Sequence, residues 1–179
     1  MSNRACDVAA TEKLFKAVAE RDVEGVGCAL SEGADVNARS DDGVLLLHLA
    51  TDDMCSGVEI VRILLSEKEI NVNAMDSLGN TALHSAILNG NIDVVRALLM
   101  DTRTDVNARG WKLRTPLELA LVKNKAKIAQ TILGHSKVSV LDEDGVNCTA
   151  LGLAQQKGYD GIVKMIIARR WLQLNISNN

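Results

Sequence analysis

Apolar positions recur along the chain in a fixed order, which starts with a Leu followed three residues later by an Ala. Five such pairs occur: Leu14/Ala17, Leu47/Ala50, Leu83/Ala86, Leu117/Ala120 and Leu151/Ala154. The intervals between their leucines are 33, 36, 34 and 34 residues. A near-constant period in this range is typical of stacked supersecondary units rather than of one mixed core. The pattern therefore predicts five repeated units.

A second apolar patch follows each pair and ends in two adjacent apolar residues. These endings are Ala29-Leu30, Leu64-Leu65, Leu98-Leu99, Ile132-Leu133 and Ile166-Ile167. Both patches have helical spacing over about eight to ten residues, which is too short for a helix to be stable alone. Extended segments such as 34–38 and turn residues such as Asp41-Asp42-Gly43 come next. The expected unit is helix, tight turn, helix and a loop with a turn, in an all-α chain.

One unit shows the consensus of a known repeat. Residues 76–108 contain Asp-x-x-Gly-Asn-Thr-Ala-Leu-His-x-Ala, then Gly-Asn-x-x-Val-Val-x-x-Leu-Leu and Asp-Val-Asn-Ala. This closely resembles the ankyrin repeat, as does Thr115-Pro116-Leu117-Glu118, and the resemblance covers roughly residues 10–176. It implies an all-α ankyrin-repeat solenoid with β-hairpin-like loops. We expect a single domain over residues 1–179, with units at 10–39, 40–75, 76–109, 110–143 and 144–176, the first and last acting as caps.

The first helix of each repeated unit does not begin in the same way in every unit. Thr81, Thr115 and Thr149 suit an N-cap, where the hydroxyl meets free backbone N–H groups. Pro116 fits the first helical position, which needs no N–H. Leu45-Leu46 replaces the Thr-Pro start in the second unit, and an insertion lengthens its turn between helices. We therefore expect faster hydrogen exchange at residues 51–58 than at 88–93.

Three further positions carry structural expectations. Gly33 is expected to take a left-handed conformation that ends a helix. His48 and His84 occupy the usual His position of the resembled family, where the ring is expected to bond the backbone of a neighbouring hairpin; Glu118 stands there in the fourth unit. Trp171 is expected to cover the last core layer.

Composition narrows the function classes. Twenty basic and 23 acidic residues give a net charge of −3, whereas a generic nucleic-acid binder carries a basic excess. The four cysteines show no metal-binding spacing, and the first residues show no apolar leader. We therefore expect free thiols in the cytoplasm or another reducing compartment, with delivery into a host cell left open.

Catalytic motifs are absent from the sequence. There is no G-x-x-x-x-G-K, H-E-x-x-H or G-x-S-x-G, and the histidines and cysteines fall in different units. We expect no enzyme, no catalytic residue, no metal site and no cofactor.

The resemblance places a partner on the concave face, formed by loop tips and the first helices. Its candidate residues in this chain are Arg39, Asp41, Asp42, Asp52, Asp53, Met75, Ser77, Leu78, Asn80, Leu88, Asn89, Arg109, Trp111, Lys112, Arg114 and Lys123. They change from acidic in the second unit, through apolar, to basic in the fourth, a gradient that would orient an elongated partner. Ordinary solvated tips are the alternative.

Trp111 is the most unusual of these residues, because Asp or Gly would satisfy a turn there. Flanked by Arg109, Lys112 and Arg114, it has the composition of a binding hot spot. Alternatively, Trp111 folds back to shield Leu113.

Two classes of function stay open. The favoured one is a non-catalytic protein–protein interaction module, acting as scaffold, adaptor or inhibitor for a protein of unknown identity. The second is a nucleic-acid-binding protein that uses the basic fourth unit. A narrower variant is a bacterial effector delivered into a host cell. We expect a monomer, since the first and last units are expected to act as caps, and no small-molecule substrate. We also expect no membrane segment, since no run approaches about 18 apolar residues.

Overall fold

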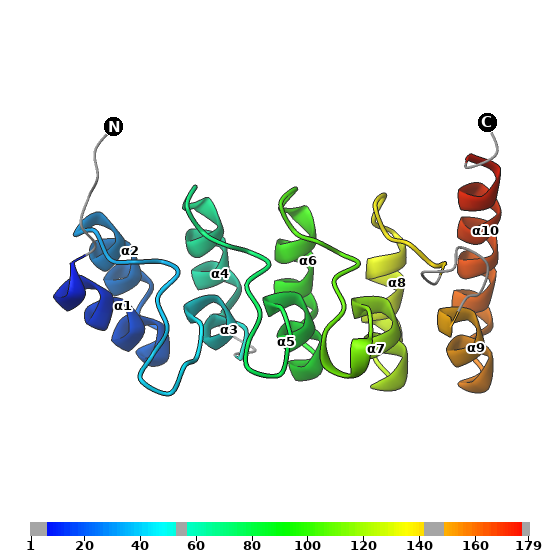
Figure 1. Ribbon diagram of the computed structural model, residues 1–179, viewed down its shortest axis with the longest axis horizontal. Coiled ribbons are helices and arrows are strands. Elements are labelled where there is room, and N and C mark those ends of the chain that lie inside the picture. Colours follow the sequence, from blue (N-terminus) through cyan, green and yellow to red (C-terminus); the bar gives the residue numbers. More distant parts are fainter. Residues whose placement is uncertain (1–6, 53–56, 142–148, 177–179) are drawn as a thin grey trace. The chain divides into compact units, whose positions relative to one another are not determined.

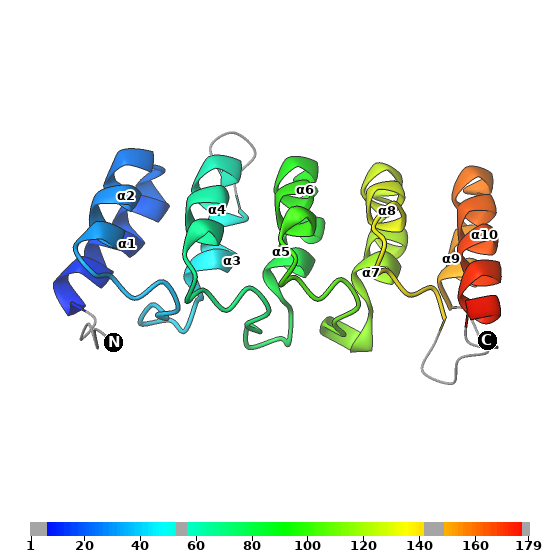
Figure 2. The same cartoon turned by 90° about the horizontal axis from the view of Figure 1, so that it is seen from above.

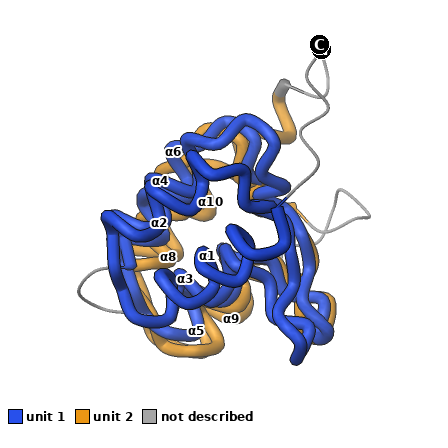
Figure 3. Tube along the Cα trace, turned by 90° about the vertical axis from the view of Figure 1, so that its left-hand side faces the viewer, with its two compact units in different colours: residues 1–104 blue, residues 105–179 orange. Residues whose placement is uncertain are grey.

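The computed structural model describes residues 7–52, 57–141 and 149–176. These ranges contain ten α-helices and one short 3₁₀-helix, so the all-α prediction is confirmed (Figure 1). The chain divides into two compact units, residues 1–104 and 105–179, which Figure 3 shows in different colours. The single domain expected over residues 1–179 stays a prediction.

Unit 1, residues 1–104, holds three helix pairs in two layers. Its helices are α1 (Val8–Glu20), α2 (Val23–Ser31), α3 (Leu46–Ala50), α4 (Gly57–Ser66), α5 (Ala82–Asn89) and α6 (Ile92–Met100). The first helices form one layer, in which α3 packs on α1 and α5, and the second helices form the other, in which α4 packs on α2 and α6 (Figure 2). This is the predicted stacking of helix–turn–helix repeats.

Unit 2, residues 105–179, holds two helix pairs built on the same plan. It consists of the 3₁₀-helix η1 (Trp111–Leu113), α7 (Pro116–Val122), α8 (Ala126–Leu133), α9 (Thr149–Gln156) and α10 (Asp160–Ile176). Helix α9 packs on α7, and α10 packs on α8 and α9.

The recurring Leu–Ala pairs form the core under the first helices. Leu14, Leu83 and Leu117 are almost fully buried, and Leu47 is buried as well. The second apolar patch is buried around Val26, Val61, Val95, Ala129 and Ile166. The last repeat is less covered, because Leu151 and Val163 are only half-buried.

Helix starts follow the predicted differences between repeats. The Thr115 hydroxyl accepts the N–H of Glu118 at 3.3 Å, and the Glu118 carboxylate accepts the N–H of Thr115 at 3.0 Å. At α5 the His84 Nδ1 accepts the N–H of Thr81 at 3.3 Å. Leu45 makes no side-chain cap, and α3 has only five residues. Glu118 thus replaces the family's His with the same bond to the backbone.

Asparagine side chains tie successive loops together. The Asn37 side chain donates to the Glu69 carbonyl at 2.7 Å and accepts the N–H of Asn71 at 2.7 Å. In unit 2 the Asn107 side chain makes the same pair of bonds, to Lys137 and Ser139, at 2.9 and 2.7 Å. These bonds hold each loop at a fixed distance from the next.

Two arginines close the ends of second helices. Arg103 donates to the carbonyl of Leu65 in the last turn of α4 and to those of Glu67 and Lys68 just after it, at 2.6–3.3 Å. Arg169 donates to the carbonyl of Leu133, the last residue of α8, at 2.9 Å, and to those of His135 and Ser136 after it. A guanidinium satisfies carbonyls that a helix end leaves unpaired.

Several sequence expectations find a definite outcome here. Gly33 has φ 96°, as predicted. The expectation for Trp171 is wrong, because 65% of it is exposed on α10 rather than covering the core. Cys28 is a free thiol, and the other three cysteines lie outside the described residues. No helix of the described residues is both long and apolar enough to cross a membrane.

Candidate functional site

The loop of the second repeat presents two carboxylates at its tip. The N–H of Gly43 donates to the Ser40 carbonyl at 2.8 Å, and the N–H of Ser40 donates to the Val44 carbonyl at 2.9 Å. An isolated antiparallel bridge joins Arg39 to Leu45 below the turn. Asp41 and Asp42 are exposed. Main-chain bonds, the Ser40 hydroxyl and the Arg39 guanidinium close this hairpin-like loop, and both carboxylates face solvent.

The loop of the third repeat presents apolar side chains in the corresponding place. The Asp76 carboxylate accepts the N–H groups of Leu78 and Asn80 at 2.9 and 2.8 Å, which fixes the turn. Leu78 is 64% exposed and Met75 is 46% exposed, with Ser77 also exposed beside them. The turn therefore holds a large apolar side chain in water.

Asn80 does not belong to this surface, contrary to the sequence-based expectation. It is 2% exposed, and its carbonyl accepts a 2.8 Å hydrogen bond from His48 Nε2 in the preceding repeat. The predicted bond between this His and a neighbouring loop is thereby confirmed. Burial lowers the pKa of His48, whose Nδ1 has no hydrogen-bond partner. Asn80 is a structural residue that no partner could reach.

The remaining unit 1 candidates lie at the ends of first helices. Leu88 is 37% exposed on α5, and Asn89 is exposed while its amide donates to the Thr51 carbonyl at 3.2 Å. Asp52 is exposed just after α3, and Asp53 lies outside the described residues.

The fourth-repeat loop in unit 2 brings an indole and two ammonium groups together. The Lys112 Nζ lies 4.3 Å from the centre of the Trp111 ring, and the Lys123 Nζ lies 5.8 Å from it. Both distances are within the range of cation–π attraction. Trp111 is 38% exposed. The loop is therefore a basic aromatic surface, as its composition predicts.

The backbone of this loop is strained. Lys112 and Leu113 both have φ 57°, a left-handed conformation that costs any residue with a β-carbon. Glycines with φ 77° and 79°, Gly43 and Gly79, stand at the position of Leu113 in the two preceding loops. Leu113 is 73% exposed, so the alternative in which Trp111 shields it is wrong.

The two candidate arginines at loop bases serve the loops themselves. The Arg39 guanidinium donates to the carbonyls of Gly43 and Met75 at 3.0 and 3.1 Å. Arg109 donates to the Leu113 carbonyl at 2.8 Å, the same bond across the loop. Arg114 is half-buried after η1. These arginines therefore position the tips.

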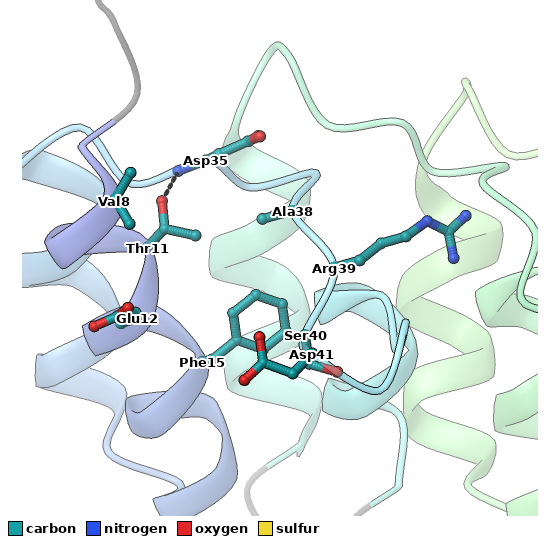
Figure 4. Close-up of a pocket in the computed structure, with 9 residues that line it drawn as sticks. All are labelled: Val8, Thr11, Glu12, Phe15, Asp35, Ala38, Arg39, Ser40 and Asp41. Carbon is teal, nitrogen blue, oxygen red and sulfur yellow. Dashed lines mark hydrogen bonds between the residues drawn. The ribbon is translucent and has the colours of Figure 1, made fainter.

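Sequence reasoning missed a groove in unit 1, between α1 and the loop 35–41. It has a volume of about 440 Å³ and is lined by Val8, Thr11, Glu12, Phe15, Asp35, Ala38, Arg39, Ser40 and Asp41. Figure 4 shows the Phe15 ring between α1 and the loop, with the Arg39 guanidinium directed away from it. Phe15 is the only phenylalanine in a chain with 2% aromatic residues, and that rarity is the signal that could have found the groove.

Charged, apolar and aromatic side chains make up the candidate surface. Among the described residues no group of three or more His, Cys, Asp or Glu side chains could hold a metal ion. The exposed candidates are carboxylates, polar and apolar side chains and an indole with lysines, on the loops and at the ends of first helices.

A comparison with known families accounts for this architecture. A family model for ankyrin repeats, in three copies, matches residues 14–110, which is more than half of the chain. The matched segment contains the second- and third-repeat loops, the His48–Asn80 bond and the Thr81 helix start. The chain belongs to the ankyrin repeat family.

Proposed function

We propose that this chain is a non-catalytic adaptor that binds a protein partner through its loop tips and the exposed ends of its first helices. Ankyrin repeats are generally protein–protein interaction modules, and they are typically non-catalytic. The partner surface in unit 1 consists of Asp41, Asp42, Asp52, Met75, Ser77, Leu78, Leu88 and Asn89, and that in unit 2 of Trp111, Lys112, Arg114 and Lys123. Arg39 and Arg109 hold the tips in place.

The single observation that carries this proposal is the exposure of Leu78. A turn residue needs no large apolar side chain, and 64% of Leu78 faces water on a turn already fixed by Asp76. Covering an exposed Leu favours association by about 25 cal/mol per Å² of apolar area. Because the turn is preformed, little ordering of the backbone opposes binding.

The unit 2 tip supports the same function with different chemistry. Two ammonium groups beside one indole attract a carboxylate, and the half-exposed ring offers apolar area to the rest of the partner. The nucleic-acid alternative uses the same lysines, but it leaves the exposed Asp41, Asp42 and Asp52 unexplained.

The test compares proteins captured by the wild-type chain with those captured by two serine variants. Leu78→Ser removes the tip residue, and Met100→Ser removes an equally apolar residue that is 82% exposed at the end of α6. A true partner is lost with Leu78→Ser and kept with Met100→Ser, and it binds the purified Leu78→Ser chain at least about tenfold more weakly. A purified partner that binds both variants as tightly as the wild type would contradict the proposal.

A mobility-shift assay with RNA and duplex DNA at several salt concentrations distinguishes nucleic-acid binding from the adaptor role. Binding that falls steeply with salt and disappears in Lys112→Gln/Lys123→Gln would replace the adaptor role with nucleic-acid binding.

A further inference from the structure

The groove beside Phe15 differs in chemistry from the apolar tips. Its floor is apolar, because Val8 and Phe15 of α1 and Ala38 of the loop line it, and the Phe15 ring lies between α1 and the loop. Its volume of about 440 Å³ falls within the range of about 300–1,000 Å³ that is typical of ligand sites. The floor alone would take any apolar group.

Acidic residues line both walls of the groove. Glu12 lies on α1, and Asp35 and Asp41 lie on the loop that faces it. Glu12 and Asp41 are exposed, and neither makes a hydrogen bond or an ion pair among the described residues. Their negative charge is therefore available to a ligand.

Among the described residues, no basic side chain of the groove neutralises these carboxylates. The guanidinium of Arg39 donates to two backbone carbonyls and points out of the groove. Both lysines of α1 pair elsewhere, Lys13 with Glu32 at 2.7 Å and Lys16 with Glu20 at 3.9 Å. The groove therefore has a negative rim around an aromatic floor.

Internal bonds hold the two walls in place. The Thr11 hydroxyl on α1 accepts the N–H of Asp35 at 2.9 Å, and the Asp35 carboxylate accepts the N–H of Asn37 at 2.8 Å. Because the walls are joined before any ligand arrives, the groove is preformed.

We infer that this groove binds an arginine or lysine side chain presented by an extended segment of the protein partner. The methylene stem packs against Phe15 and Val8, and the cationic group lies over the ring and among the carboxylates of Glu12 and Asp41. Cation–π attraction and opposite charge favour the same occupant. A neutral apolar side chain would leave the carboxylates unused, and an acidic one would be repelled. The inference rests on the proposed function, since it names the chemistry of one contact with the protein partner.

The test uses a small probe and needs no identified partner. The full chain is titrated with the amide of acetyl-Gly-Arg-Gly, and with the same peptide carrying citrulline, a neutral isostere of arginine. We expect the arginine peptide to bind with a dissociation constant on the order of 1–10 mM and to shift the backbone amide signals of Thr11, Phe15 and Ser40. The citrulline peptide should bind at least about fivefold more weakly.

Matched variants locate the contact. Glu12→Gln/Asp41→Asn removes two rim charges and should weaken the arginine peptide about tenfold. Glu24→Gln/Glu59→Gln makes the same change in net charge on α2 and α4, at exposed residues outside the groove, and should leave binding unchanged. Phe15→Leu keeps an apolar floor without the ring and should weaken binding about fivefold. If Phe15→Leu unfolds the chain, the variant Glu12→Gln/Asp41→Asn still tests the proposal.

The inference is overturned if the citrulline peptide binds equally well, if the two double variants behave alike, or if the shifted signals lie outside α1 and the loop 35–41. Its failure is distinct from failure of the adaptor role. A partner that is lost with Leu78→Ser but binds Phe15→Leu and the rim variant like the wild type would keep the adaptor role and remove the groove from it.

Discussion

The hydrogen bonds of a residue determine whether it supports the fold or is exposed to a partner. Its position in the sequence alone does not distinguish these two roles. Asn80 and Leu78 are two residues apart on one turn. Asn80 is buried and receives the His48 bond, whereas Leu78 is 64% exposed. Polarity would suggest the opposite assignment. The hydrogen bonds of the turn, rather than the polarity of the side chains, determine which of the two residues is buried.

Leu113 provides a direct test of strain at a tip. Because its φ is 57° where the two preceding loops have Gly43 and Gly79, Leu113→Gly should raise the free energy of unfolding by about 1 kcal/mol. Urea unfolding followed by circular dichroism measures this change.

The reciprocal control is Gly79→Leu, at a position where an added side chain meets open space and only the backbone conformation opposes it. It should destabilise by about the same amount. A Leu113→Gly variant that is no more stable than the wild type would show that this turn carries no strain.

The buried histidine makes stability depend on pH. Burial lowers the pKa of His48 in the folded chain, so the unfolded chain takes up a proton first as the pH falls through the ordinary histidine value of 6.5. Stability should therefore fall from pH 7 toward the lowered pKa, and the fall should be smaller in His48→Gln. Urea midpoints at several pH values measure it; equal slopes in the two proteins would contradict the prediction.

At the scale of elements, the repeat pattern predicts the helices well and their ends less well. Period and apolar spacing indicate each helix pair, and the Thr-Pro and Leu45-Leu46 contrast indicates which start is weak. The length of α10, through Ile176, and the exposure of Trp171 are not predictable in this way. An apolar side chain indicates a helix face, but only the packing neighbours determine whether that face is covered.

The packing of a loop against a neighbouring helix also could not be predicted from the sequence. The groove beside Phe15 depends on where the 35–41 loop lies against α1, which the Thr11–Asp35 bond determines. The exchange of His84 for Glu118 looks like a loss of the family pattern. The structure shows instead that both accept the same backbone N–H.

The contribution of the α7 capping box to stability can be tested by removing one hydroxyl group. Thr115→Ala removes the acceptor for the Glu118 N–H, which should lower the free energy of unfolding by about 1 kcal/mol. Thr131→Ala in α8 is the matched control, because its hydroxyl bonds only the Lys127 carbonyl within its own helix. Urea unfolding should show a clearly smaller loss for the control than for the cap variant.

Hydrogen exchange should reflect the uncapped start of α3. Amides at residues 51–58, of which 53–56 lie outside the described residues, should exchange faster than those at 88–93, where the longer α5 ends and Gly90 has φ 78°. Exchange monitored by mass spectrometry or NMR measures the difference. Equal protection would mean that packing, rather than the cap, holds α3 in place.

At the scale of the whole molecule, charge and apolar surface are expected to govern different steps of binding. Asp52 is an exposed charge, and Trp111 is a partly exposed ring beside two lysines. Exposed charges mainly steer encounter, whereas a desolvated aromatic anchor slows departure. The chain itself is expected to be a monomer, which light scattering at micromolar concentration would check.

Binding kinetics with a confirmed protein partner test this division. Asp52→Lys should lower the association rate, and the effect should shrink as salt rises. Trp111→Ala should raise the dissociation rate and weaken binding by about 2 kcal/mol. Surface plasmon resonance at low and high salt separates the two rates. A Trp111→Ala chain that dissociates like the wild type would remove the unit 2 tip from the interface.

The closed loop tips have a consequence for how this chain can change over evolutionary time. The turn at 40–43 is closed by main-chain bonds with the side chains of Arg39 and Ser40, and the turn at 76–80 by main-chain bonds with the Asp76 carboxylate; Gly43 and Gly79 supply the left-handed position of each. The side chains at 41, 42, 77 and 78 therefore take no part in holding the fold. Selection, in nature or in a randomised library, can rewrite these four positions for a new target while the scaffold beneath them keeps its stability.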